Sequence, residues 1–209
     1  MAKYKLVIFD SDGTLADTLP WFRNAFHQLA DQYGFKPLTD TDHQHLRTLS
    51  TREMLDYLKV PLWRIPALIA GMRRLMAEHI DEFSLFNGIG EALRDLSAGG
   101  IVLGVVSSNS RENVRDILGT RNAGLIGHYA CGASMFGKPS KLRTLLRSSG
   151  ASAQDAIYIG DEMRDGEAAH KVGMAYGAVA WGYHSLDMLR ELAPEEIFTK
   201  PADIGEKLR

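Results

Sequence analysis

The sequence predicts an α/β protein with a doubly wound parallel sheet and a small all-helical cap inserted after the first strand. Four apolar runs, at 6–9, 101–106, 156–159 and 175–180, have the length and composition of strands that are buried on both faces. Single helical patterns separate the later runs, and strands joined in this way form a parallel sheet with right-handed crossovers. Residues 16–86 show helical patterns without a strand-like run. The expected core is therefore Rossmann-like.

The 209 residues are predicted to form one compact domain that carries an insertion. The α/β core would comprise residues 1–15 and 87–209, and the helical cap residues 16–86. With 45% hydrophobic and 24% charged residues, the composition is ordinary for a soluble globular protein. The formal net charge of −2 argues against a nucleic-acid-binding surface, which requires a basic excess.

The cysteine count and the apolar runs bear on the compartment. A single cysteine, Cys131, excludes an internal disulfide framework and fits a reducing environment. We expect no leader, because the chain opens directly into its first strand, and no membrane-spanning segment, because no apolar run is long enough. These features predict a cytoplasmic protein that does not bind nucleic acid or membranes. We expect it to be a monomer or a homodimer.

The cap helices are predicted from helical spacing and from start and stop signals. Ser50 and Glu53 form a capping box, in which each side chain satisfies a backbone N–H of the other residue. Gly34 is well placed to end the first helix. The expected cap helices cover 20–33, 43–49, 54–58 and 67–83.

In the core, glycines and hydroxyl residues mark the ends of the expected helices. Gly99 and Gly100 end the first one, and the serine-rich run after strand 101–106 can cap the next. A loop with three glycines is expected over 124–132, and the tail is expected to be helical. The expected core helices cover 91–96, 111–118, 140–149, 166–172, 185–192 and 203–209.

Polar side chains follow three of the four predicted strands. Asp10 and Asp12 come after the first strand, residues 107–109 after the second and the acidic run 161–165 after the third. Ligands of doubly wound sheets bind beyond the carboxyl ends of the strands, so these three clusters should meet at one site. Carboxylates held close together need a counter-ion, and Mg²⁺ is the usual cation of mixed carboxylate and phosphate sites.

Four short motifs occur in the order in which a known enzyme family carries them. They are Asp-x-Asp-Gly-Thr from Asp10, a serine after the second strand at Ser107, Gly-Lys-Pro around Lys138, and Gly-Asp-x-x-x-Asp with Asp161 and Asp165. Together they resemble the haloacid dehalogenase-like (HAD) phosphohydrolases, in the phosphoglycolate-phosphatase-like branch that has a helical cap. The resemblance covers nearly the whole chain, but only these four motifs are specific.

The resemblance implies roles for the acidic residues. Asp10 would be the nucleophile that becomes an aspartyl-phosphate, and Asp12 would be the general acid/base. Mg²⁺ would be held by the Asp10 carboxylate, the backbone carbonyl of Asp12 and the Asp161 carboxylate. Asp165 would bind the metal through water or orient a neighbour. Glu162 is a less favoured alternative as the metal-binding acid of this motif. The alternative for the last motif is a helix start whose acids suit the helix dipole.

Ser107, Ser108, Asn109 and Lys138 are the candidate phosphate-binding residues. The resemblance implies that Ser107 hydrogen-bonds the phosphate, with Ser108 and Asn109 as backbone or side-chain partners, although the same residues can cap the following helix. Lys138 would steady the nucleophile and the phosphate. Lys141 competes for this role, because the family usually shows Lys-Pro-x-Pro and a lysine occupies the fourth position here. We favour Lys138, which follows a glycine and precedes the proline.

Arg47 and Arg52 are the candidate specificity residues of the cap. They lie near a helix-to-helix junction, where capped relatives often carry such residues, and an arginine fork suits a second anion such as a carboxylate. The alternative is that both are surface arginines. The segment Trp-Gly-Tyr-His at 181–184 is expected to pack near the rim of the site, and no chemistry is assigned to it.

The predicted function is Mg²⁺-dependent hydrolysis of a small phosphate monoester, phosphoglycolate-like, through an aspartyl-phosphate. A sugar phosphomutase would share this core, and so would a phosphonatase, which needs a cap lysine; Lys36 and Lys59 lie in no recognisable motif. A true dehalogenase lacks the second acid, so Asp12 argues against it. A non-enzymatic phosphate-binding regulatory module is the remaining alternative, which the intact catalytic acids and lysine disfavour.

Overall fold

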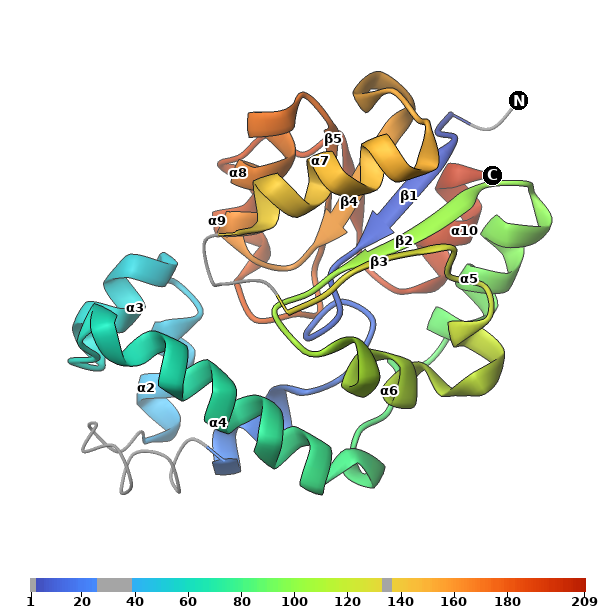
Figure 1. Ribbon diagram of the computed structural model, residues 1–209. Helices are drawn as coiled ribbons and strands as arrows, with labels where there is room; N and C mark the ends of the chain where they lie inside the picture. Colours follow the sequence, from blue (N-terminus) through green and yellow to red (C-terminus); the bar gives the residue numbers. More distant parts are fainter. Residues whose placement is uncertain (1–2, 26–38, 133–136) are drawn as a thin grey trace.

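The computed structural model describes residues 3–25, 39–132 and 137–209, which form a parallel sheet with helices on both faces (Figure 1). The sheet has six strands in the order β3-β2-β1-β4-β5-β6, and all neighbouring strands are parallel. Because the first strand lies inside the sheet, the chain builds one half and then the other, which is the expected doubly wound topology. The strands are β1 (Leu6–Phe9), β2 (Val102–Val106), β3 (His128–Ala130), β4 (Ala156–Gly160), β5 (Ala175–Val179) and β6 (Glu196–Phe198).

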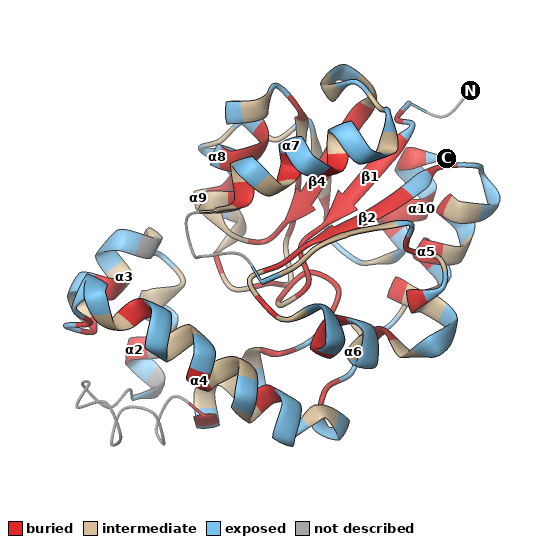
Figure 2. Cartoon of the chain, viewed as in Figure 1, coloured by how far each residue is buried: buried red, intermediate tan, exposed pale blue. Residues whose placement is uncertain are grey.

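The core lies on both faces of the sheet, because successive strand residues point in opposite directions. Val7 and Phe9 of β1 belong to one apolar cluster, and Leu6 and Ile8 to the other. The central strands are buried along nearly their whole length (Figure 2). The first cluster is covered by α5 (Ile89–Ala98), α6 (Arg111–Ala123) and α10 (Ala202–Leu208), and the second by α7 (Lys138–Ser149), α8 (Met163–Val172) and α9 (Leu186–Arg190).

Two strands were missing from the sequence expectations. The loop expected at 124–132 contains β3, so that expectation was wrong at this point. Strand β6 lies between the two expected tail helices, 185–192 and 203–209, where no element was predicted. Each strand has three residues and lies at an edge of the sheet, where one neighbour supplies its hydrogen bonds. A run of three residues is too short to show a period of two, so pairing with β2 and β5 decides these strands.

Several core helices differ from their expected limits, and the structure gives the reason for three of them. Helix α7 begins at Lys138, two residues early, because a proline is well tolerated in the first turn. Helix α8 begins at Met163, since the Asp165 side chain accepts a 3.0 Å hydrogen bond from the backbone N–H of Glu162 and so caps the helix there. Helix α6 continues to Ala123 across a kink at Gly119, where φ is 69°.

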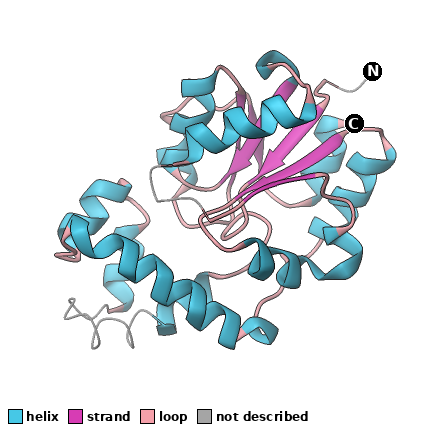
Figure 3. Ribbon diagram, viewed as in Figure 1, coloured by secondary structure: helices cyan, strands magenta, loops and turns pink. Residues whose placement is uncertain are grey.

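Helices between β1 and α5 pack together beyond the ends at which the strand arrows point (Figures 1 and 3). We call residues 39–83 the helical region; it contains α2 (Asp40–Leu46), α3 (Thr51–Tyr57) and α4 (Ile65–Glu78). The expected capping box of Ser50 and Glu53 is present. Leu55, Leu58, Val60 and Ile65 form the centre of its small apolar cluster. Of the predicted helix 20–33, residues 20–25 are helical, and the rest, with its expected end at Gly34, lies outside the described residues.

The chain leaves the sheet after β1 and returns to it before α5 through two connecting segments that lie side by side. Ala16 and Leu85 form an antiparallel bridge, the backbone N–H of Asp17 donates to Ser84 O at 2.9 Å, and that of Phe86 donates to Leu15 O at 3.0 Å. An inserted unit needs two neighbouring connections of this kind. The arrangement supports the predicted division of the chain at 15/16 and 86/87, which stays a prediction.

Candidate active site

The candidate active site lies at the carboxyl ends of β1, β2 and β4. Because β1 pairs with both β2 and β4, the segments that follow these three strands are brought together at the point where the strand order reverses. One cavity of about 440 Å³ is lined by Asp10 and Asp12 after β1, Ser108 after β2 and Glu162 after β4. The three sequence clusters therefore meet, as the strand order requires.

At the floor of the site, a buried lysine bridges two carboxylates. The ammonium group of Lys138 donates to Asp10 Oδ2 at 2.7 Å and also contacts Asp165 Oδ1. The Tyr158 hydroxyl donates to the same Asp165 oxygen at 2.9 Å. Asp10 is 3% exposed and Lys138 2% exposed. Lys141, the competing lysine, instead donates to the backbone carbonyl of Cys131.

Burial and ion pairing have opposite effects on the pKa values of the charged groups around Lys138. Burial raises the pKa of Asp10 to about 7, although the Lys138 charge offsets part of the shift. Burial also raises the pKa of Asp12 to about 6, again against the attraction of Lys138. Burial would lower the pKa of Lys138, but the carboxylates of Asp10 and Asp165 outweigh it and raise that pKa. The lysine is therefore a permanent cation.

Asp161 is held by donors from two other segments. Its Oδ1 accepts a 2.6 Å hydrogen bond from the Thr14 hydroxyl, and its Oδ2 accepts one of 2.8 Å from the backbone N–H of Tyr183. A Cβ on Gly13 would come within 2.3 Å of Asp161 Oδ2, and a Cβ on Gly182 within 2.1 Å of its Cβ. Only glycine fits at these two positions, so both loops close directly onto the carboxylate.

The 181–184 segment is thus part of the site's framework. Besides the Tyr183 contact, the indole of Trp181 donates to Thr14 O at 3.1 Å, and His184 accepts at Nδ1 from the backbone N–H of Met163 at 2.9 Å. Burial lowers the pKa of His184, which favours the neutral imidazole that this acceptor role requires. The sequence signal for these roles was only the position of the segment directly after a buried strand.

A group of acidic oxygens suited to a hard cation lies beside the lysine. One oxygen each of Asp10, Glu162 and Asp165 lies within 4.8 Å of the others. Glu162 pairs with Arg164; burial would raise the pKa of this acid, but the arginine outweighs it and lowers the pKa. The Oδ1 atom of Asp12 is buried and has no hydrogen-bond partner among the described residues.

These residues fit a divalent cation on charge and on donor chemistry. Five acids, Asp10, Asp12, Asp161, Glu162 and Asp165, gather around two cations, Lys138 and Arg164. Carboxylate oxygens are the ligands that Mg²⁺ prefers. Asp161 has both oxygens hydrogen-bonded to the protein, whereas Glu162 lies in the acidic group, so the choice between these two ligands stays a prediction.

The residues after β2 are ordered by contacts within the loop and with α4. The Ser107 hydroxyl is fully buried and accepts from the backbone N–H of Asn109 at 2.9 Å. The Asn109 amide donates to Met76 Sδ at 3.3 Å, and Arg73 Nε donates to Ser108 O at 2.7 Å. Arg73 and Met76 belong to α4, so the helical region directly contacts residues 107–109, the candidate phosphate-binding residues after β2. Capping of α6 is done by Ser110, which leaves residues 107–109 for other contacts.

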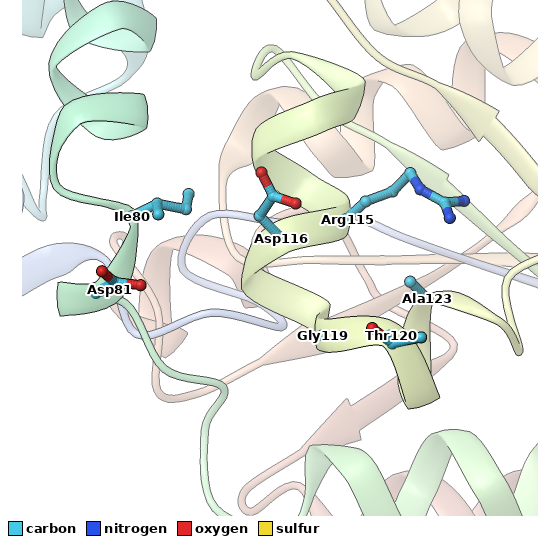
Figure 4. Close-up of a pocket in the computed structure, with 7 residues that line it drawn as sticks. All are labelled: Ile80, Asp81, Arg115, Asp116, Gly119, Thr120 and Ala123. Atoms are coloured by element: carbon cyan, nitrogen blue, oxygen red, sulfur yellow. The ribbon is translucent and has the colours of Figure 1, made fainter.

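The two candidate specificity arginines are placed differently. Arg47 is half-buried and lines the site cavity, whereas Arg52 is exposed and is not among the residues lining it. A second cavity, of about 370 Å³, lies between the 3₁₀ helix Ile80–Glu82 and α6 and shares no lining residue with the first (Figure 4). Asp81, Arg115 and Asp116 are its charged residues.

Comparison with known proteins identifies the family. Residues 7–179 match the family model of the haloacid dehalogenase-like hydrolases. The chain belongs to this family. A phosphoglycolate phosphatase of Synechococcus elongatus is 31% identical over 201 residues, which are 95% of this chain and 94% of the relative. A tyrosine-protein kinase of Mycobacterium tuberculosis, PtkA, is 28% identical over 218 residues, covering 97% of this chain and 70% of the kinase.

The fold comparison agrees with the sequence comparison. The crystal structure of a protein from Lactobacillus plantarum, described as a putative phosphoglycolate phosphatase, superposes with a TM-score of 0.83 at 23% identity, covering 98% of this chain and 99% of that one. The HAD resemblance and the Rossmann-like fold class are thereby confirmed. Within the described residues, no helix is both long and apolar enough to cross a membrane.

Proposed function

We propose that this HAD-family phosphatase hydrolyses a small phosphate monoester through an aspartyl-phosphate formed on Asp10, with Mg²⁺ as its cofactor. The observation that carries the proposal is the buried Asp10–Lys138–Asp165 bridge at the floor of a cavity that also contains Asp12. An ionised carboxylate is required for attack, and the lysine beside Asp10 favours that form. The phosphoglycolate phosphatase relative supports a substrate of this class.

The residues can be assigned to two successive displacements. An Asp10 oxygen attacks phosphorus while the ester P–O bond breaks, and Asp12 donates a proton to the leaving alkoxide. Water then attacks the same phosphorus, the Asp10–phosphorus bond breaks, and Asp12 takes the proton from the water. Asp12 suits both steps because a carboxyl group with a pKa of about 6 can both hold and release a proton near neutral pH.

The remaining polar residues would bind and orient the phosphoryl group. Lys138 and the Ser107 hydroxyl, with the backbone around Ser108 and Asn109, would contact its oxygens. Asp10 and the acids after β4 would hold the divalent cation, which supplies positive charge to the transferring phosphoryl group. One relative of this chain is named a tyrosine-protein kinase, so hydrolysis must be separated from transfer to a second molecule.

The test is a screen of the purified protein with Mg²⁺ against a panel of phosphate monoesters, following release of inorganic phosphate. We expect turnover of at least one small monoester, and a phosphorylated protein trapped by acid quench. Asp10→Asn should abolish both signals while its far-UV spectrum shows that the protein remains folded. A phosphorylated product without phosphate release would indicate a phosphomutase, and wild-type turnover by Asp10→Asn would exclude the nucleophile assignment.

A further inference from the structure

The helical region contributes a mostly apolar wall to the site cavity. From the helical region, six aliphatic or thioether side chains line it: Leu46, Met54, Leu55, Leu58, Val60 and Leu68. Leu19 and Phe22 line it from the segment after β1. The cavity of about 440 Å³ lies within the range of about 300–1,000 Å³ typical of small-molecule sites. Its size and lining suit a ligand with an apolar body.

Packing within the helical region leaves part of this apolar surface uncovered. Leu55, Leu58 and Val60 are 3%, 3% and 6% exposed and form the local core. Leu46 and Leu68 pack against that core but are only half-buried, and their remaining surface faces the cavity. A ligand with an apolar body that covers this surface is stabilised, because apolar area is removed from water.

A sugar would fit this wall poorly. Each hydroxyl buried without a hydrogen-bond partner loses its hydration without compensation. On the side of the helical region, Gln44 and Arg47 are the polar lining residues, with Arg23 from the segment before it. Most of the wall therefore offers no partner to a polyhydroxylated leaving group, and it would discriminate against one.

Arg47 adds a charge preference to the apolar wall. Its side chain is half-buried and lines the cavity, and its guanidinium makes no hydrogen bond or ion pair with any described residue. Its backbone carbonyl is fixed by the Ser185 N–H at 3.1 Å, which ties the end of α2 to the core. A positioned guanidinium with free donors binds a carboxylate bidentately.

Resting on the proposed phosphatase function, we propose that the substrate's alcohol half is an apolar group bearing a carboxylate. The apolar body would contact the wall of Leu46, Met54 and Leu68, and the carboxylate would pair with Arg47. The phosphate would lie at Asp10, which lines the same cavity. The proposal thus names a substrate class that a two-carbon acid or a sugar phosphate does not satisfy.

The experiment compares kcat/KM for three esters of primary alcohols, so that the leaving groups are similar: benzyl phosphate, 4-(phosphonooxymethyl)benzoic acid and glucose 6-phosphate. We expect the carboxylated ester to exceed benzyl phosphate by about tenfold or more, and benzyl phosphate to exceed glucose 6-phosphate by a similar factor. Phosphoglycolate is measured alongside. The proposal would be overturned if kcat/KM for glucose 6-phosphate or for phosphoglycolate equalled or exceeded that for the carboxylated benzyl ester.

Arg47→Met isolates the charge preference. It should reduce kcat/KM for the carboxylated ester about tenfold more than for benzyl phosphate, and Arg47→Lys should recover part of the difference. Arg74→Met is the matched control, because Arg74 is an exposed arginine of α4 that does not line the cavity. An equal loss on both esters would overturn the carboxylate assignment. Melting temperatures identify any variant that fails to fold. If Arg47→Met does not fold, the ratio of the two kcat/KM values in Arg47→Lys tests the carboxylate assignment instead.

Activity on 4-nitrophenyl phosphate separates this proposal from the proposed function. Its leaving group departs without protonation, so it reports the phosphoryl chemistry with little demand on the wall. Turnover of this ester combined with a preference for glucose 6-phosphate would refute the substrate class alone. Absence of turnover on every ester, by a folded protein with Mg²⁺, would refute the phosphatase function itself.

Discussion

Two regions line the same cavity but hold their side chains in different ways. One is the group of polar residues at the carboxyl ends of β1, β2 and β4, which we call the strand edge, and the other is the helical region. At the edge, Asp10, Lys138 and Asp165 are almost fully buried, and each contacts a charged or polar partner. In the helical region, Leu46 and Leu68 are half-buried and pack without direction. Phosphoryl chemistry needs fixed polar geometry, whereas recognition of an apolar group tolerates variation. The edge should therefore be intolerant of substitution and the wall tolerant.

The largest loss of stability and activity is expected for Lys138→Met. Removing this ammonium leaves the Asp10 and Asp165 carboxylates without their cation, and breaking a buried ion pair typically costs about 3–5 kcal/mol of unfolding free energy. Activity should be lost as well. Urea denaturation measures the first effect and phosphate release the second. Lys141→Met, whose lysine contacts only a backbone carbonyl in the described structure, is the matched control and should cost about 1 kcal/mol.

Asp12→Asn should lower kcat by about 10²–10⁴ through loss of proton transfer. The loss should be greatest for alkyl phosphates, whose leaving oxygen needs a proton, and smaller for 4-nitrophenyl phosphate. Breakdown of the aspartyl-phosphate also needs the base, so rapid-quench measurements should show an initial burst. Equal small losses on both substrates without a burst would mean that Asp12 has only a structural role.

Metal removal should make the stability of the edge depend on pH. The folded-state pKa values of Asp10, about 7, and Asp12, about 6, lie above the ordinary aspartate value. Their protonation favours the folded state, so this contribution is present below about pH 4 and is lost as the pH rises through 6 to 7. After EDTA treatment, the melting temperature should fall between about pH 5 and pH 8.

Mg²⁺ should reverse that fall, because it binds the ionised carboxylates and only the folded state presents them together. EDTA should also remove activity, and Ca²⁺ should replace Mg²⁺ poorly because its coordination is looser. The control is Asp12→Asn, which should show a shallower pH dependence than the wild type. Unchanged turnover after thorough chelation, together with a flat stability profile, would contradict the metal assignment.

The smallest effect is expected for Leu68→Ala on the wall. Because this side chain is half-buried, truncation should cost about 1–2 kcal/mol, below the range of about 2–5 for a fully buried leucine. KM for benzyl phosphate should rise while kcat stays within about twofold. Calorimetry and steady-state kinetics measure the two. A loss of kcat as large as that of Lys138→Met would remove the distinction between edge and wall.

Local sequence patterns were enough to determine much of this protein. The apolar run of β1, the polar residues after three strands and the Ser50–Glu53 capping box all depend on neighbours within a few positions, and the structure contains each of them. The order of motifs was also sufficient for the family, which the comparisons confirm. The roles of the individual site residues stay predictions.

Tertiary structure decided what depends on residues far apart in the chain. It placed Lys138, and not Lys141, between Asp10 and Asp165, and it made the 181–184 segment a support for Asp161. It also created β3 and β6, which are too short to be recognised without their neighbours. These features arise from burial and pairing between distant segments, whose energies no local spacing of residues encodes.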